Sequence, residues 1–127
     1  MEQLYKHAYQ TFIDGIISGE PIAANVAYIL TTAADYGKDV AGNNEHFHAS
    51  VDYETFDELK RDCVGIVVES LFGKDGIKSA VDTVVLMAAA FGFKHERERI
   101  QHNCDDRIPD NIMSIILEND LLNRSTK

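Results

Sequence analysis

Apolar residues recur three or four positions apart along most of this chain. The clearest stretch is 2–18, where the apolar residues fall on one helical face: Leu4, Tyr5, Ala8, Tyr9, Phe12, Ile13, Ile16 and Ile17. Similar stripes run through 22–36, 56–72 and 79–91. No segment alternates convincingly with the period of a strand, although 65–68 is rich in β-branched residues. The pattern predicts an all-α fold.

Residues that stop or start helices divide these stripes. We expect breaks at Gly37, around Gly73, near Gly92 and at Ile108-Pro109-Asp110. Thr55 and Glu58 have the spacing of a capping box and should open the helix at 56–72. The sequence thus predicts a single-domain bundle of five or six helices, with one irregular loop around residues 37–53.

The length of 127 residues suits one domain covering 1–127. We expect a last helix over 112–122 and a frayed tail at 123–127. The N-terminus lacks the pattern of a signal peptide, and no apolar run approaches the length of a membrane span. Cys63 falls on an apolar stripe, where it behaves as a core residue, so nothing points to a disulfide framework. These features predict a cytoplasmic protein.

The chain is acidic, with 21 Asp and Glu against 12 Lys and Arg and a formal net charge of −9. Such a charge is repelled by phosphate backbones and anionic lipid, so direct nucleic-acid and membrane binding are not expected. The charge concentrates in residues 1–63, which hold 11 acidic and four basic residues. The acidic segment, residues 35–62, contributes Asp35, Asp39, Glu45, Asp52, Glu54, Asp57, Glu58 and Asp62.

An acidic segment of this kind is either a solvated surface that maintains solubility or a face that attracts a basic partner. No nucleophile elbow, phosphate-binding loop or dinucleotide motif is present, so an enzyme is less expected than a binding protein, and no cofactor is predicted. No family is recognisable. Size, acidity and helical content are similar to those of bacterial immunity proteins and phage-encoded inhibitors as broad classes. The leading hypothesis is a non-enzymatic, acidic protein-binding module of an inhibitor or immunity type, whose basic partner could be a nuclease.

The alternative hypothesis is a small metal-binding helical enzyme or sensor. Histidine and cysteine side chains ligate transition metals, and two histidines two residues apart lie on one side of an extended segment. The candidate ligands are His46, His48, His95, His102 and Cys104. A homodimer is a third possibility, because the Ala-rich stripe at 22–36 permits close packing against a second copy.

Overall fold

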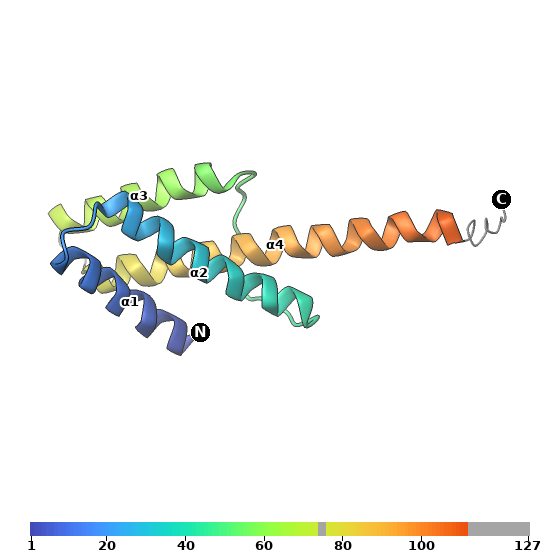
Figure 1. Cartoon of the computed structure of the whole chain (residues 1–127), viewed down its shortest axis with the longest axis horizontal. Coiled ribbons are helices and arrows are strands. Elements are labelled where there is room, and N and C mark those ends of the chain that lie inside the picture. Colours follow the sequence, from blue (N-terminus) through green and yellow to red (C-terminus); the bar gives the residue numbers. More distant parts are fainter. Residues whose placement is uncertain (74–75, 112–127) are drawn as a thin grey trace. The chain divides into compact units, whose positions relative to one another are not determined.

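The computed structural model describes residues 1–73 and 76–111, with side chains described as far as His102. Figure 1 shows the chain. Within these residues there are four helices and no strand: α1 (Glu2–Ile17), α2 (Ile22–Gly42), α3 (Phe56–Phe72) and α4 (Ile77–Asn111). The all-α prediction is therefore confirmed. The predicted helix at 112–122 and the predicted frayed tail lie outside the described residues.

The chain divides into two compact units, residues 1–95 and 96–127. The first unit contains α1, α2, α3 and the part of α4 that ends at His95. In the described part of the second unit, α4 continues, and Arg99 donates to both carboxylate oxygens of Glu96. The predicted single domain is neither supported nor contradicted by this division.

The core of the first unit takes large apolar side chains from every helix. Phe12 of α1, Leu30 of α2, Leu59 of α3 and Val85 of α4 are fully buried in one cluster. Burying side chains of this size contributes about 1.5–3 kcal/mol each. These residues lie on the apolar stripes that predict the helices, so the pattern and the packing agree.

Helices α2 and α4 pack backbone against backbone at two glycines. A Cβ atom on Gly37 would collide with the carbonyl group of Ala89, and one on Gly92 would collide with the carbonyl group of Ala34. Both glycines are buried inside continuous helices. They are therefore packing residues, whereas the sequence indicated that they end helices.

Within residues 1–73 and 76–111, the role of Gly92 explains why there are four helices and not five or six, since the segments on both sides of Gly92 form one helix. Helix α2 runs through Gly37 to Gly42, and α4 runs through Gly92 and includes the predicted break at Ile108-Pro109-Asp110. The irregular loop consequently covers residues 43–55 rather than 37–53. The Ala-rich face of α2, which suggested a homodimer, is occupied by α4 of the same chain. Whether the chain forms a dimer stays untested.

Candidate protein-binding surface

The acidic segment extends over three consecutive elements. Asp35 and Asp39 lie on α2, the 43–55 loop carries three acids, and α3 carries the rest. Seven of the eight predicted partner-binding side chains are exposed, and only Glu58 is half-buried. The exposed members are Asp35, Asp39, Glu45, Asp52, Glu54, Asp57 and Asp62.

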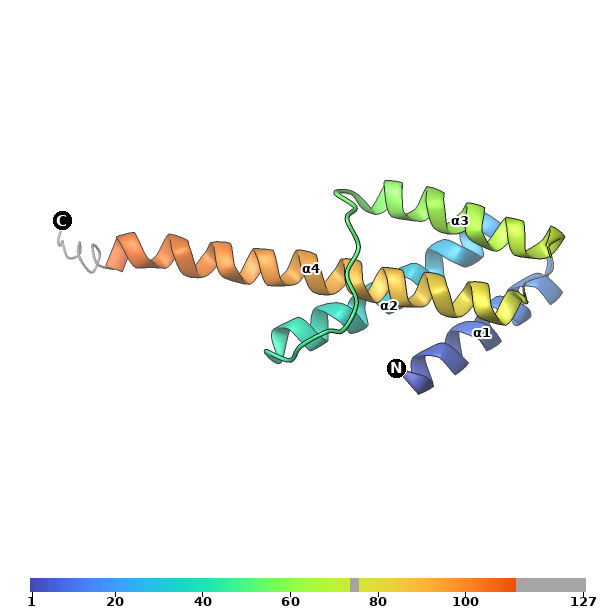
Figure 2. The same ribbon diagram turned by 180° about the vertical axis from the view of Figure 1, so that it is seen from behind.

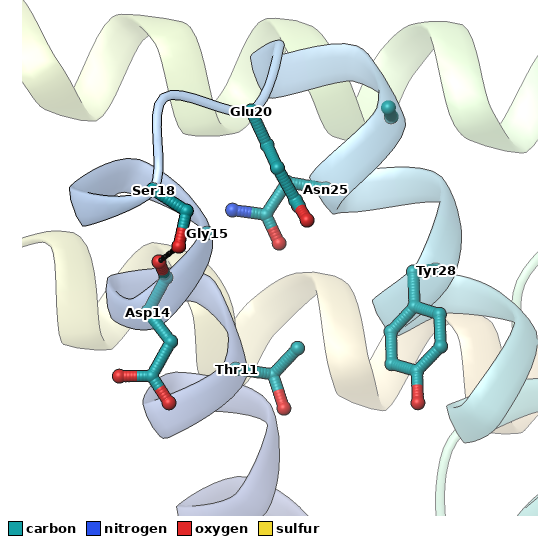
Figure 3. Close-up of a pocket in the computed structure, with 8 residues that line it drawn as sticks. Thr11, Asp14, Gly15, Ser18, Glu20, Asn25 and Tyr28 are labelled. Carbon is teal, nitrogen blue, oxygen red and sulfur yellow. Dashed lines mark hydrogen bonds between the residues drawn. The ribbon is translucent and has the colours of Figure 1, made fainter.

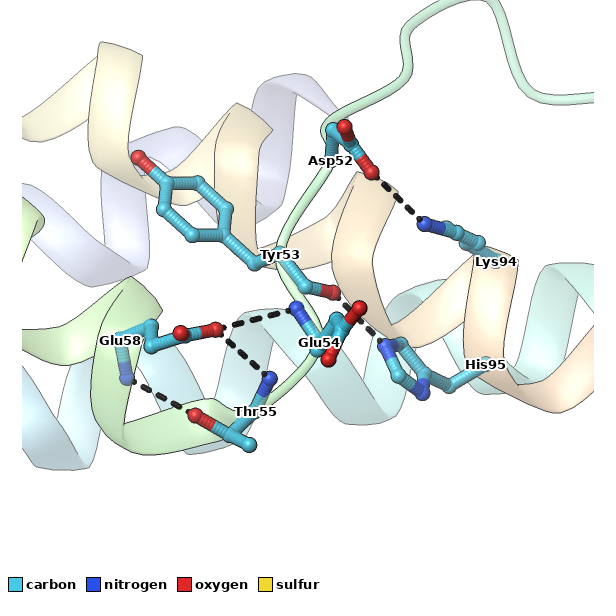
Figure 4. A network of polar contacts seen from close by, with 7 residues as sticks. All are labelled: Asp52, Tyr53, Glu54, Thr55, Glu58, Lys94 and His95. Atoms are coloured by element: carbon cyan, nitrogen blue, oxygen red, sulfur yellow. Dashed lines mark hydrogen bonds and ion pairs between the residues drawn. The ribbon is translucent and has the colours of Figure 1, made fainter.

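The capping box at the start of α3 uses Glu58 for folding. The backbone N–H of Glu58 donates to Thr55 Oγ1 at 3.2 Å, while Glu58 Oε1 accepts from the backbone N–H groups of Thr55 and Glu54. Figure 4 shows these bonds. Backbone N–H groups at the N-terminus of a helix have no acceptor within the helix, and these side-chain bonds provide one. Glu58 therefore acts mainly within the chain, and a partner would have to compete with this cap.

Three consecutive residues of α4 contact the 43–55 loop: Phe93, Lys94 and His95. The ring of Phe47 stacks on Phe93 with centroids 5.7 Å apart, and Lys94 Nζ lies 3.5 Å from Asp52 Oδ1. His95 Nε2 lies 3.1 Å from the carbonyl oxygen of Tyr53, and because a carbonyl only accepts, the imidazole proton is at Nε2. The loop crosses α4 on its way to α3 (Figure 2). The packing holds the loop's acids in a defined place.

Tyr53 joins the loop to α3. Its hydroxyl donates to Asp62 Oδ2 at 2.8 Å. This bond to a carboxylate, together with burial and the negative charge of Asp62, raises the pKa of Tyr53 to about 12. Asp62 thus has a partner within the chain, as Asp52 has in Lys94.

Five carboxylates of the acidic segment remain without such a partner. In the part of the chain that the structure describes, no ion pair or side-chain hydrogen bond engages the carboxylates of Asp35, Asp39, Glu45, Glu54 and Asp57. The cations nearest in sequence are Lys38, Lys60 and Arg61, and none of them belongs to the described ion pairs. These pairs link Lys78 to Asp82, Lys94 to Asp52 and Arg99 to Glu96. These five side chains can meet a partner without breaking a contact of the fold.

In the described part of the chain, the predicted metal ligands do not come together in one cluster. Among residues 1–73 and 76–102, no group of three or more His, Cys, Asp or Glu side chains could hold a metal ion. His46 and His48 are exposed on the loop, and His95 bonds to Tyr53 and packs on Phe91 with centroids 4.2 Å apart. The side chain of Cys104 lies outside the described residues.

The sequence analysis overlooked Asn25. It is a buried polar residue in α2, on the apolar face between Ile22 and Ile29, and only 1% of its surface is exposed. A polar side chain at spacing i+3 from Ile22 and i−4 from Ile29 was the signal that could have found it. Its amide contributes to a pocket between α1 and α2.

Comparison with known proteins gives no relative for this arrangement. No family model, no curated protein and no solved structure matches the chain significantly. In the described residues, no helix combines the length and the apolar character that crossing a membrane requires. Residues 1–73 and 76–111 thus form an all-helical structure with an exposed acidic segment.

Proposed function

We propose that this chain is a non-enzymatic, acidic protein-binding module of an inhibitor or immunity type. The observation that carries the proposal is a set of five exposed carboxylates that form no ion pair among the described residues: Asp35, Asp39, Glu45, Glu54 and Asp57. A formal net charge of −9 adds to their field. Together these charges favour a basic protein surface as the partner.

An exposed acidic segment can make association with a basic partner faster and more selective. Complementary charges steer an encounter and can raise the association rate by about tenfold or more, and added salt removes this gain. Ion pairs that stay near the solvent-exposed rim of an interface keep part of their hydration, so they carry a smaller desolvation cost than fully buried ion pairs. The loop contacts with α4 support the proposal, because a fixed loop loses little entropy when it binds.

A further part of the proposal concerns the compartment. We place the chain in the cytoplasm, where its buried and free Cys63 would face no oxidising environment. The class of basic partner that fits best is a nucleic-acid enzyme such as a nuclease, because its own substrate-binding surface must be cationic.

The test uses two variants with the same change in net charge. The first, D39K/E54K/D57K, reverses three free carboxylates of the acidic segment. The second, E2K/E69K/E98K, reverses three exposed acids elsewhere. Each set includes one acid from the first turn of a helix, Asp57 or Glu2, so the loss of helix-end stabilisation is matched.

Immobilised wild type and both variants are exposed to cell lysate, and captured basic proteins are quantified by mass spectrometry at low and high salt. The proposal expects one basic protein to be retained by the wild type and by the E2K/E69K/E98K control, and lost with D39K/E54K/D57K. Equal retention by both variants would refute it, as would capture that salt does not weaken. Circular dichroism shows whether both variants are folded.

A further inference from the structure

A pocket of about 600 Å³ lies where the chain turns from α1 into α2. Six polar or aromatic side chains line it: Thr11, Asp14, Ser18, Glu20, Asn25 and Tyr28. Figure 3 shows them on the last turns of α1, the connecting turn and the first turns of α2, with the carboxylate of Asp14 turned away from Asn25 and Tyr28. Its lining residues are separate in sequence from the acidic segment.

The turn places a carboxylate at the pocket. Gly19 adopts a left-handed conformation with φ of +82°, which suits glycine because it lacks a Cβ atom. The N–H of Gly19 donates to the Ile16 carbonyl at 3.1 Å, and the N–H of Glu20 donates to the Gly15 carbonyl at 2.9 Å. This pair of bonds is a Schellman motif, which ends α1 and turns Glu20 back toward it. The pocket therefore lies beside both the C-terminal, negative end of the α1 dipole and the N-terminal, positive end of the α2 dipole, and these two partial charges offset each other.

Asn25 brings an acceptor without a donor into this pocket. Its Nδ2 donates to the carbonyl oxygen of Phe12 at 3.0 Å, which fixes the orientation of the amide. Its Oδ1 is buried and has no hydrogen-bond partner. In Figure 3 this oxygen faces the space between Thr11 and Tyr28. A buried acceptor left without a donor destabilises the fold, so a donor group that enters the pocket would recover stability.

Gly15 makes room for this arrangement. A Cβ atom at Gly15 would collide with the Asn25 amide and would come 2.9 Å from Glu20 Oε1. The amide of Asn25 and the carboxylate of Glu20 consequently share one space beside the α1 backbone. Because Glu20 is exposed, its side chain is free to swing aside and let a ligand reach Asn25.

We propose that the α1–α2 pocket binds an organic cation that carries N–H donors, an ammonium or a guanidinium group. Two groups at the pocket favour it: the carboxylate of Glu20 and the unpartnered oxygen of Asn25. The carboxylate of Asp14 already accepts a hydrogen bond from Gln10 at 2.9 Å. Tyr28, which is 59% exposed, offers an aromatic face on which such a cation stacks. A metal ion fits less well, since the described residues contain no group of three ligating side chains.

The cation could be a free polyamine or a Lys or Arg side chain of another protein, and two probes separate these sources. Spermidine represents the free amine, and Nα-acetyl-arginine methylamide represents the side chain. Nα-acetyl-citrulline methylamide is the control, because its urea group keeps the shape and part of the N–H donors of arginine without the charge. Each probe is titrated into the ¹⁵N-labelled full-length chain, and amide shifts are followed by NMR.

The proposal expects saturable shifts confined to residues 11–28 with spermidine, with the arginine derivative, or with both, and none with the citrulline derivative. Preference for spermidine identifies a free amine as the ligand, and preference for the arginine derivative identifies a protein side chain. Three outcomes would overturn the proposal. The shifts could spread over the acidic segment, neither cation could reach saturation, or the citrulline derivative could bind as well as the cations.

Variants separate the pocket from the general charge of the chain. Glu20→Gln and Asn25→Leu should each weaken cation binding about tenfold, because the first removes the negative charge and the second removes an acceptor for the N–H groups of the cation. Asp35→Asn removes an equally exposed carboxylate on α2 and should change the affinity less than about twofold. Equal weakening by Glu20→Gln and Asp35→Asn would mean that only net charge matters, and would refute the site. Since Glu20 is exposed, Glu20→Gln tests the site even if Asn25→Leu perturbs the fold.

Discussion

Gly37 of α2 lies against the carbonyl group of Ala89 in α4, with no space for a Cβ atom between the two helices. A methyl group at Gly37 would stand 2.8 Å from the carbonyl carbon of Ala89 and from the backbone nitrogen of Phe93. Because these neighbours are backbone atoms of a continuous helix, they cannot rotate away as a flexible side chain could. The helices themselves would have to separate.

We therefore expect Gly37→Ala to destabilise the chain by about 3 kcal/mol, the cost of overpacking a tight interface. This outcome opposes helix propensity, which favours alanine over glycine by about 1 kcal/mol. The measurement is the free energy of unfolding from urea denaturation followed by circular dichroism.

Gly65→Ala provides the matched control. Gly65 lies in the middle of α3, is exposed, and has nothing within 4 Å of the position that a Cβ atom would take. Alanine should stabilise α3 there by about 0.5–1 kcal/mol. If both substitutions stabilised the chain, the close approach of α2 and α4 would be wrong.

The hydrogen bond between Tyr53 and Asp62 makes stability depend on pH in the alkaline range. The folded-state pKa of Tyr53, about 12, lies above its ordinary value of 10. The contribution of this bond is thus complete below pH 10 and is lost as the pH rises toward 12. Titration of ¹³C-labelled tyrosine by NMR should show that Asp62→Asn lowers the Tyr53 pKa toward 10. Asp57→Asn, on the same helix, should leave the Tyr53 pKa unchanged. If both variants lowered the Tyr53 pKa equally, a specific bond between Tyr53 and Asp62 would be excluded.

Local signals were readable from the sequence, and signals that depend on a neighbouring helix were not. The spacing of Thr55 and Glu58 predicted the start of α3 because a capping box involves only consecutive residues. Gly37 and Gly92 were assigned to helix ends because glycine is common there, whereas their actual role depends on the backbone of another helix.

The same distinction applies to the candidate site. The sequence identified the acids of the acidic segment, and seven of the eight are exposed. It did not reveal that Glu58 completes a cap or that Asp62 binds Tyr53, because a charge count treats all carboxylates alike. Asn25 was missed for a related reason: its lack of a partner is a property of the packed pocket.

The capping box should be worth a measurable part of the stability of α3. Thr55→Ala removes the acceptor for the Glu58 N–H and should cost about 1 kcal/mol. Thr31→Ala is the comparison, because the Thr31 hydroxyl only bonds back to the Ala27 carbonyl inside α2, and its loss should change stability by less than about 0.5 kcal/mol. Urea denaturation of both variants measures the difference, and equal effects would contradict a specific capping role.

Cys63 should be chemically inert as long as the chain is folded. Its side chain is fully buried in the core, and burial, with a smaller effect of Asp62, raises the pKa of its thiol to about 12. Only the thiolate reacts rapidly, so at pH 8 the folded chain offers neither the reactive form nor access. In a Cys104→Ser variant, iodoacetamide should leave Cys63 unmodified at pH 8 and should alkylate it fully in guanidinium chloride. Rapid alkylation under native conditions would mean that the α3 face carrying Cys63 opens readily, which the packing of Cys63 with Leu59 and Val67 argues against.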